Sequence, residues 1–261
     1  MQNDSTLRTV TVAAILCVVC SVLVSSAAVM LRDRQEANKQ LDIRKNLLLS
    51  AGMIEADKEI TPDEINEAFA LIDTRIIDLE TGKYVDMKPE DFDARTAEKD
   101  PKTNYKIPSQ KDLGGIKVRA KYSEVYIGKN DNGEVAFVAL PVHGKGLWST
   151  LYGFLCLESD TKTVKGFGFY KHGETPGLGG EIDNPRWKAS WVGKTVLGKN
   201  YDPVIDVLKG SVNPASSKAN QQIDGLSGAT ITANGVEGLV NYWVGENGFG
   251  PFLANFRKGE L

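Results

Sequence analysis

The first pattern along the chain is one long apolar run. Residues 9–31 lie between Arg8 and Arg32 and contain 23 residues without a charge. At about 1.5 Å of rise per residue, a helix of this length crosses a hydrocarbon core. The pattern therefore predicts a short N-terminal tail (residues 1–8) and a transmembrane anchor (residues 9–31). A cleaved signal peptide is the alternative, because residues 26–28 (Ser-Ala-Ala) resemble a cleavage site, but the run is longer than a usual signal core.

The next region, residues 32–115, is expected to form a helical stalk and the N-terminal part of a soluble domain. Residues 33–40 are charged and continue the helix beyond the membrane. Residues 43–70 predict two amphipathic helices, and the second begins at residues 61–64 (Thr-Pro-Asp-Glu), where a capping threonine, a first-turn proline and two acids suit a helix N-terminus. Residues 88–104 are polar without an apolar period, which predicts a mobile insertion.

Strand patterns dominate the middle of the chain. Residues 74–83 predict a strand that enters a turn, and residues 116–170 predict four strands, the first two joined at a turn over residues 131–134. A helical stripe then follows near the C-terminus. We therefore expect an α+β fold, with one N-terminal transmembrane helix and a soluble domain of antiparallel sheet and flanking helices whose core is residues 116–261. The stripe consists of Val236, Leu239, Val240, Trp243 and Val244.

Composition narrows the classes of function. The chain is 41% hydrophobic and has 31 basic against 34 acidic residues, a net charge of −3. Without a basic stripe, nucleic acid is not an expected partner. With only two histidines and no GxSxG elbow, a His-rich metal site and a serine hydrolase are also poor interpretations, and we predict no metal site. Cys17 and Cys20 lie inside the apolar run and are interpreted as small fillers, and Cys156 as a core thiol.

Glycines are concentrated in three patches, residues 143–149, 172–181 and 224–230. Residues 143–149 (HGKGLWS) combine flexible backbone with a cation and a large aromatic ring, which suits a flat anionic ligand; a loop whose tryptophan fills the core is the alternative. Residues 172–181 (HGETPGLGGE) indicate a tight turn whose amides can approach a ring edge, with Glu174 able to orient the loop. An ordinary capped turn is the alternative there.

The third patch, residues 224–230 (DGLSGAT), lies just before the stripe-bearing helix. Thr232 or Asn234 is expected to cap that helix. The unpaired first-turn amides and the positive end of the helix dipole would then lie close to Thr230, where they would attract a phosphate. The alternative is a capping sequence with an ordinary β-turn.

The stretch DGLSGAT resembles the Asp-x-x-Ser/Thr-Gly-Ala-Thr/Ser flavinylation motif of the FMN-binding domain family. Together with the N-terminal span and the GKGLW and ETPGLGGE loops, it makes the whole chain similar to the C subunits of the bacterial Na⁺-translocating NADH:quinone oxidoreductase (NQR). The G subunits of the RNF complex are next nearest. The resemblance implies an electron-transfer subunit of a membrane oxidoreductase complex, with FMN as its cofactor and the other subunits as partners.

The resemblance also assigns roles to individual residues. It implies that Thr230 carries FMN through a phosphoester, made by a separate flavin transferase that uses FAD and Mg²⁺. Ser227, Gly228 and Ala229 would admit the phosphate and the transferase, and Asp224 would matter for the modification. No catalytic residue and no NADH or quinone site is expected on this chain. The ring-side residues implied are Glu174, Thr175, Gly177, Leu178, Gly179, Lys145 and Trp148.

Topology is the point on which residues and resemblance disagree. The resemblance implies a single-pass protein of the bacterial inner membrane with a periplasmic body. One basic residue before the apolar run and five soon after it favour a cytoplasmic body instead, but that rule is weakest for long translocated domains. The apolar run holds no acid, so it is not expected to conduct ions itself. A different class remains as an alternative, an anchored extracytoplasmic binding or scaffold module without flavin.

Overall fold

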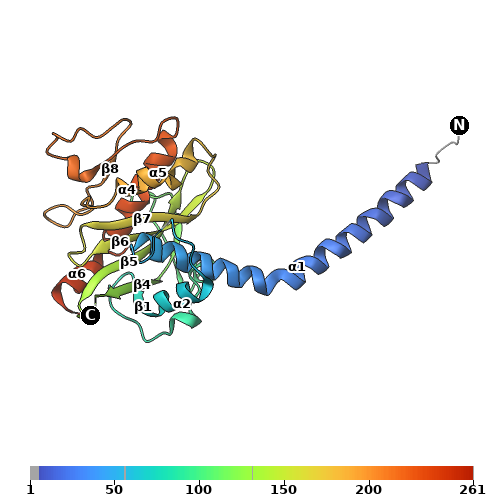
Figure 1. Cartoon of the computed structure of the whole chain (residues 1–261), viewed down its shortest axis with the longest axis horizontal. Coiled ribbons are helices and arrows are strands. Elements are labelled where there is room, and N and C mark those ends of the chain that lie inside the picture. Colours follow the sequence, from blue (N-terminus) through green and yellow to red (C-terminus); the bar gives the residue numbers. More distant parts are fainter. Residues whose placement is uncertain (1–5, 56, 131, 261) are drawn as a thin grey trace. The chain divides into compact units, whose positions relative to one another are not determined.

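The structure is a computed structural model, and it describes residues 6–55, 57–130 and 132–260 (Figure 1). The chain divides into two compact units, Met1–Ile43 and Arg44–Leu261. The predicted tail falls mostly on residues 1–5, which lie outside the described residues.

The long apolar run forms part of one helix, α1 (Thr6–Ser50). Among the described residues it is the one helix that is long and apolar enough to cross a membrane, and its most apolar stretch is not buried inside the chain. The predicted long apolar N-terminal helix is therefore confirmed. The helix continues through the charged residues 33–40, as expected. The first of the two helices predicted within residues 43–70 is the end of α1 rather than a separate element.

Five antiparallel strands form the central sheet, in the order β1-β4-β5-β6-β7 (Figure 1). The last four follow one another as neighbours, so the predicted meander is confirmed. Strand β1 pairs with β4, so one edge of the sheet comes from before residue 116. The turn predicted at residues 131–134 includes residue 131, outside the described residues. The strands are β1 (Ile72–Asp78), β4 (Tyr122–Lys129), β5 (Val135–Lys145), β6 (Thr150–Glu158) and β7 (Val164–Lys171).

Each face of the sheet is covered by different elements. One face packs in the main core with α4 (Pro185–Ala189), α5 (Thr230–Val244) and α6 (Gly250–Lys258), and the predicted stripe of α5 is buried there. On the other face, a Cβ placed on Gly166 would lie 2.0 Å from the carbonyl oxygen of Ser50, so the end of α1 packs directly on the strand. Cys156 is fully buried, as predicted.

Helix α2 (Pro62–Ala70) begins as the sequence predicts. Thr61 and Glu64 form a capping box, in which the Thr61 N–H donates to Glu64 Oε2 at 2.8 Å and the Glu64 N–H donates to Thr61 Oγ1 at 3.3 Å. Two of the N–H groups at this helix end are thus satisfied by neighbouring side chains.

The prediction of a mobile insertion over residues 88–104 is wrong. Asp93 caps a short helix by accepting from the Thr96 N–H at 2.6 Å, and the Arg95 guanidinium lies 4.6 Å from the centre of the Tyr152 ring. Because caps and a cation–π contact hold this segment, it needs no apolar period. Its elements are η1 (Pro89–Asp91), α3 (Ala94–Lys99) and β2 (Asn104–Lys106), which pairs with β3 (Val118–Ala120).

The chain between the sheet and α5 has little regular structure. Strands β8 (Asp206–Val207) and β9 (Gln222–Ile223) pair in parallel. The DGLSGAT stretch follows β9 directly and leads into α5. The short 3-10 helices η2 (Gly179–Asp183) and η3 (Ala219–Gln221) complete the fold.

Candidate functional site

The DGLSGAT stretch, residues 224–230, is here called the acceptor turn. A hydrogen bond from the Ala229 N–H to the Leu226 carbonyl, 3.1 Å long, closes it, and Gly228 has φ +71°, a conformation that favours glycine. Helix α5 begins at Thr230 itself, whose side chain is exposed. The first-turn amides of α5 have no carbonyl one turn earlier to bond, so Thr230 lies at the positive end of the helix dipole.

The predicted cap of this helix by Thr232 or Asn234 is wrong. The helix begins earlier, with Ala229 at the N-cap position and no side-chain cap bond among the described residues. Thr232 is fully buried inside the first turn, where its hydroxyl donates to Glu174. The earlier start places Thr230 within the first turn rather than ahead of it.

Short contacts hold the acceptor turn against residues 208–212. The Gly225 N–H donates to the Gly210 carbonyl at 2.9 Å, and Asp224 Oδ1 accepts from the Val212 N–H at 2.6 Å. A Cβ added to Gly225 would lie 2.0 Å from the Leu208 carbonyl oxygen, so the two backbones meet at a distance that only glycine allows. The motif's leading acid is therefore a loop anchor in this structure.

A single buried carboxylate joins the other two glycine patches to α5. Glu174 accepts five hydrogen bonds: from the backbone N–H groups of Leu147, Trp148 and Ser149 at 3.0 to 3.1 Å, from the Ser149 hydroxyl at 2.9 Å and from the Thr232 hydroxyl at 2.7 Å. Only 5% of the residue is exposed. Three successive amides around one carboxylate form an anion nest.

The surroundings keep this carboxylate ionised. Burial raises the pKa of Glu174, but hydrogen bonds from two hydroxyls and two backbone amides outweigh that effect, and the pKa lies below its ordinary value. Glycines make room for the nest, because a Cβ on Gly146 would lie 2.7 Å from a Glu174 oxygen and one on Gly179 would lie 2.6 Å from Thr232 Oγ1. Glu174 thus points inward, beneath the loops.

Above the nest, four large apolar side chains are exposed. Residues 146–149, the hairpin loop between β5 and β6, expose Leu147 by 42% and Trp148 by 69%. Residues 173–180, the glycine loop, expose Leu178 by 46%, and α5 exposes Ile231, the neighbour of Thr230. Leu178 faces the acceptor turn, since its Cδ2 lies 3.0 Å from a Cβ placed on Gly228. These four side chains form an apolar rim, of which Leu178 and Ile231 border the acceptor turn and Thr230.

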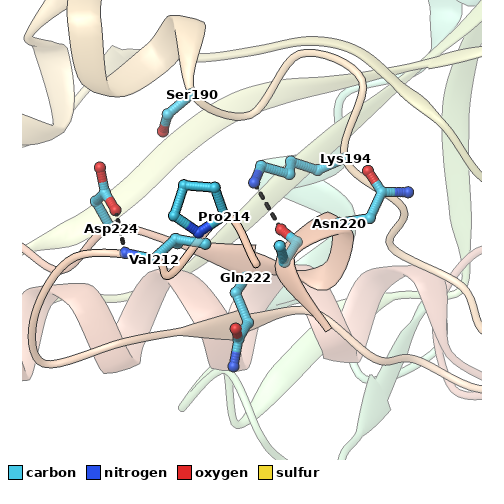
Figure 2. A pocket seen from close by; sticks show the side chains of 8 residues that line it. Ser190, Lys194, Val212, Pro214, Asn220, Gln222 and Asp224 are labelled. Carbon is cyan, nitrogen blue, oxygen red and sulfur yellow. Dashed lines mark hydrogen bonds between the residues drawn. The ribbon is translucent and has the colours of Figure 1, made fainter. Parts of the chain in front are cut away.

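Two recesses are lined in part by residues of the acceptor turn. The smaller, about 340 Å³, is lined by residues that include Ser227, Gly177 and Asp224. The larger, about 500 Å³, is shown in Figure 2; there the Lys194 ammonium donates to the Ala219 carbonyl at 2.7 Å. Thr230 lines neither recess, so the site is defined by the hydroxyl, the helix terminus and the apolar rim rather than by these two hollows.

The remaining predicted residues belong to the same two loops. The Thr175 carbonyl accepts from the Leu178 and Gly180 N–H groups, and Gly177 has φ +76°, so the glycine loop is a tight turn as predicted. Lys145 is exposed at the start of the hairpin loop, with Nζ 3.5 Å from the Trp148 carbonyl oxygen.

Sequence reasoning missed how His172 and Ser149 contribute. His172 Nδ1 accepts from the Glu174 N–H at 3.2 Å, so the ring proton lies on Nε2, which donates to Asp183 Oδ2 at 2.6 Å. The Ser149 hydroxyl also accepts from the Gly173 N–H at 2.8 Å. Both residues stand in the predicted glycine patches, but nothing in their spacing indicates these partners.

The residues present fit a flavin mononucleotide. A phosphate needs N–H donors and positive potential, which the start of α5 provides beside the exposed Thr230 hydroxyl. An isoalloxazine ring needs apolar surface, which Trp148 and Leu178 provide. Gly228, two residues before Thr230, has no side chain that could block the approach to the hydroxyl.

Comparison with known proteins agrees with this class of site. Residues 146–245 match the family described as the FMN-binding domain, a span that contains the hairpin loop, the glycine loop and the acceptor turn.

Similarity over the whole chain identifies a narrower family than the FMN-binding domain. The C subunit of the Na⁺-translocating NADH-quinone reductase of Pseudomonas aeruginosa is 47% identical over 261 residues, 99% of each chain, and that of Yersinia pestis is 43% identical over 100% of this chain and 96% of its own. The crystal structure of Shewanella oneidensis NqrC covers 85% of this chain and 99% of its own, with a TM-score of 0.77 and 32% identity. The chain belongs to the family formed by the C subunits of the Na⁺-translocating NADH-quinone reductase, as the sequence motifs predict, rather than to the RNF G subunits.

Proposed function

We propose that this chain is an electron-transfer subunit of a Na⁺-translocating NADH-quinone reductase and carries FMN on Thr230 through a phosphoester. The observation that carries the proposal is an exposed hydroxyl in the first turn of a 15-residue helix. The phosphate of an attached flavin would keep negative charge, which the first-turn amides and the helix dipole stabilise.

The two loops opposite Thr230 would hold the ring. Trp148 and Leu178 would pack on the isoalloxazine, and the turn at Thr175, Gly177 and Gly179 would present backbone amides to its edge. Lys145 is an exposed cation beside the hairpin loop, with its Nζ 3.5 Å from the Trp148 carbonyl oxygen. Glu174 acts from beneath as a positioning residue, since its carboxylate is occupied by the hairpin loop and Thr232.

The flavin supplies the redox chemistry, and the chain binds and orients it. Electrons would come from one neighbouring redox centre of the complex and leave to another, in a reaction that the complex couples to Na⁺ export. We propose no NADH, quinone or metal site on this chain, which would serve as a relay. A covalent tether suits that role because the cofactor stays bound in every redox state.

Attachment would be made by a separate flavin transferase that uses FAD and Mg²⁺. The Thr230 hydroxyl oxygen would form the new bond to the FMN phosphorus, the pyrophosphate bond of FAD would break, AMP would leave, and the hydroxyl proton would be released. Ser227, Gly228 and Thr230 are exposed while Ala229 is small and buried, which would leave the transferase room to approach the hydroxyl.

We further propose that α1 anchors the chain once in the bacterial inner membrane and that the body lies in the periplasm. Protease added to intact spheroplasts would digest the body and leave the anchor. Digestion only after lysis would place the body in the cytoplasm, where the basic residues that follow the apolar run would put it.

The test of the flavin is the intact mass of the full chain, expressed beside a flavin transferase and extracted from membranes in detergent. Wild type should gain the mass of FMN less one water, Thr230→Ser should keep the gain and Thr230→Ala should lose it. A wild-type chain without added mass would favour the scaffold alternative, in which Thr230 is part of a turn and the Thr230→Ala variant supports normal electron flux.

A further inference from the structure

Glu174 is a buried charge whose described partners are all neutral. Its five hydrogen-bond donors are backbone N–H groups and hydroxyls, and it takes part in no ion pair that the described residues form. Lys171, three residues before Glu174, has its Nζ 6.0 Å from the Tyr152 ring centre, and Lys145, at the start of the hairpin loop, has its Nζ 3.5 Å from the Trp148 carbonyl oxygen. The donors stabilise the charge, but they do not cancel it.

This charge is bonded to both parts of the chain that are proposed to hold the flavin, the hairpin loop and the first turn of α5. One oxygen bonds Thr232, which shares a helical turn with the proposed attachment residue, and both oxygens bond the hairpin loop at the residues whose side chains form the apolar rim. Hydrogen bonds of 2.7 to 3.1 Å therefore join the carboxylate both to α5, which carries Thr230, and to the hairpin loop.

We propose that Glu174, besides positioning the loops, holds a permanent negative charge under the flavin and thereby lowers the flavin's reduction potential. This inference rests on the proposed function. Each electron added to the flavin brings negative charge to the ring unless a proton follows from water, and a fixed carboxylate nearby opposes that charge. The electrons come from and return to the neighbouring redox centres, so no further reactant is needed.

The low pKa of Glu174 supports a charge that persists over the physiological range. The nest also explains why a carboxylate is used here. A glutamine would turn one of the two oxygens into a donor that faces N–H groups, so it would remove the charge and disturb the loop together.

Three variants separate charge from geometry, each measured as the full chain with attached flavin by spectroelectrochemical titration. Glu174→Gln removes the charge and should raise the midpoint potential. Thr232→Val and Ser149→Ala each remove a donor but keep the charge, so their potentials should stay at or below that of wild type. An unchanged potential for a fully loaded Glu174→Gln chain overturns the inference, as does a rise in either donor variant equal to the rise in Glu174→Gln.

Two further measurements keep the test decisive. If Glu174→Gln fails to fold, Thr232→Val decides, because removing a donor leaves more of the charge uncompensated and a raised potential would contradict the inference. Flavin loading, measured by in-gel fluorescence, separates the two proposals. A wild-type chain without attached flavin sinks the proposed function, whereas loaded chains with equal potentials sink only the role of the Glu174 charge.

Discussion

The acceptor turn and the loops opposite it are two walls of one site, and they are held by different means. Close backbone contacts and the Asp224 carboxylate hold the acceptor turn, which meets residues 208–212 across the Gly225–Gly210 hydrogen bond. One side chain holds the hairpin and glycine loops, because Glu174 gathers three amides and two hydroxyls. The first wall should therefore fail when the backbone space at Gly225 is lost, and the second should depend on one carboxylate.

Loss of that carboxylate should have the largest effect. Glu174→Ala leaves buried amide and hydroxyl donors without an acceptor, and we expect it to reduce the free energy of unfolding by about 3 to 5 kcal/mol. Urea unfolding of the full chain in detergent measures this. The exposed Glu80 is the control, and Glu80→Ala should cost less than about 0.5 kcal/mol. Equal losses would show that the second wall does not depend on Glu174.

Backbone space at the acceptor turn comes next. Gly225→Ala places a Cβ 2.0 Å from the Leu208 carbonyl oxygen, so the backbones must separate, at a cost of about 1 to 3 kcal/mol. Flavin attachment should fall with it. Gly210 is the matched control, because it is the other half of the same hydrogen bond and a Cβ there meets nothing within 4 Å. Similar attachment yields in Gly225→Ala and Gly210→Ala would contradict the contact.

Acid should loosen one wall and spare the other. The folded pKa of Glu174 is lowered, so its stabilisation is complete above the ordinary value of 4.5 and is lost as pH falls through the lowered pKa. Amide protection factors from hydrogen exchange should drop there for Leu147, Trp148 and Ser149, while the Gly225 amide keeps its protection. Loss of protection at both walls together would indicate global unfolding instead.

The smallest effect on stability is expected from alanine substitutions at two glycines whose backbones are left-handed. Gly228 (φ +71°) and Gly177 (φ +76°) should each lose about 1 kcal/mol on change to alanine. Only Gly228→Ala also presses on a neighbour, since its Cβ would lie 3.0 Å from Leu178 Cδ2. Thermal unfolding should therefore give similar values for both variants, while the emission of attached flavin changes only in Gly228→Ala. Identical emission would remove Leu178 from the ring site.

Local rules predicted much of this molecule. Runs of strand-forming residues separated by turns indicated the four-strand meander, the 23-residue uncharged run indicated the helix α1, and Thr61 with Glu64 marked the start of α2. The acceptor turn was also predictable, because seven consecutive residues carry its whole pattern.

Long-range contacts explain what the sequence did not predict. The partners of Glu174 stand 25 to 27 and 58 residues away, so no spacing along the chain marks them. The same contacts explain the error at α5. Threonine is a common helix N-cap residue, but the Thr232 hydroxyl donates to Glu174 and the helix already begins at Thr230. Residues 88–104 were misjudged for the same reason, since Arg95 packs on a ring 57 positions later in the chain.

The most direct test of the flavin attachment is to locate the added mass by tandem mass spectrometry on the peptide that contains Ser227, Thr230 and Thr232. We predict the whole FMN mass on Thr230, because its side chain is exposed at the helix start while Thr232 is fully buried and bonded to Glu174. FMN on Ser227 or Thr232, or an unmodified peptide from cells that make the transferase, would contradict this prediction.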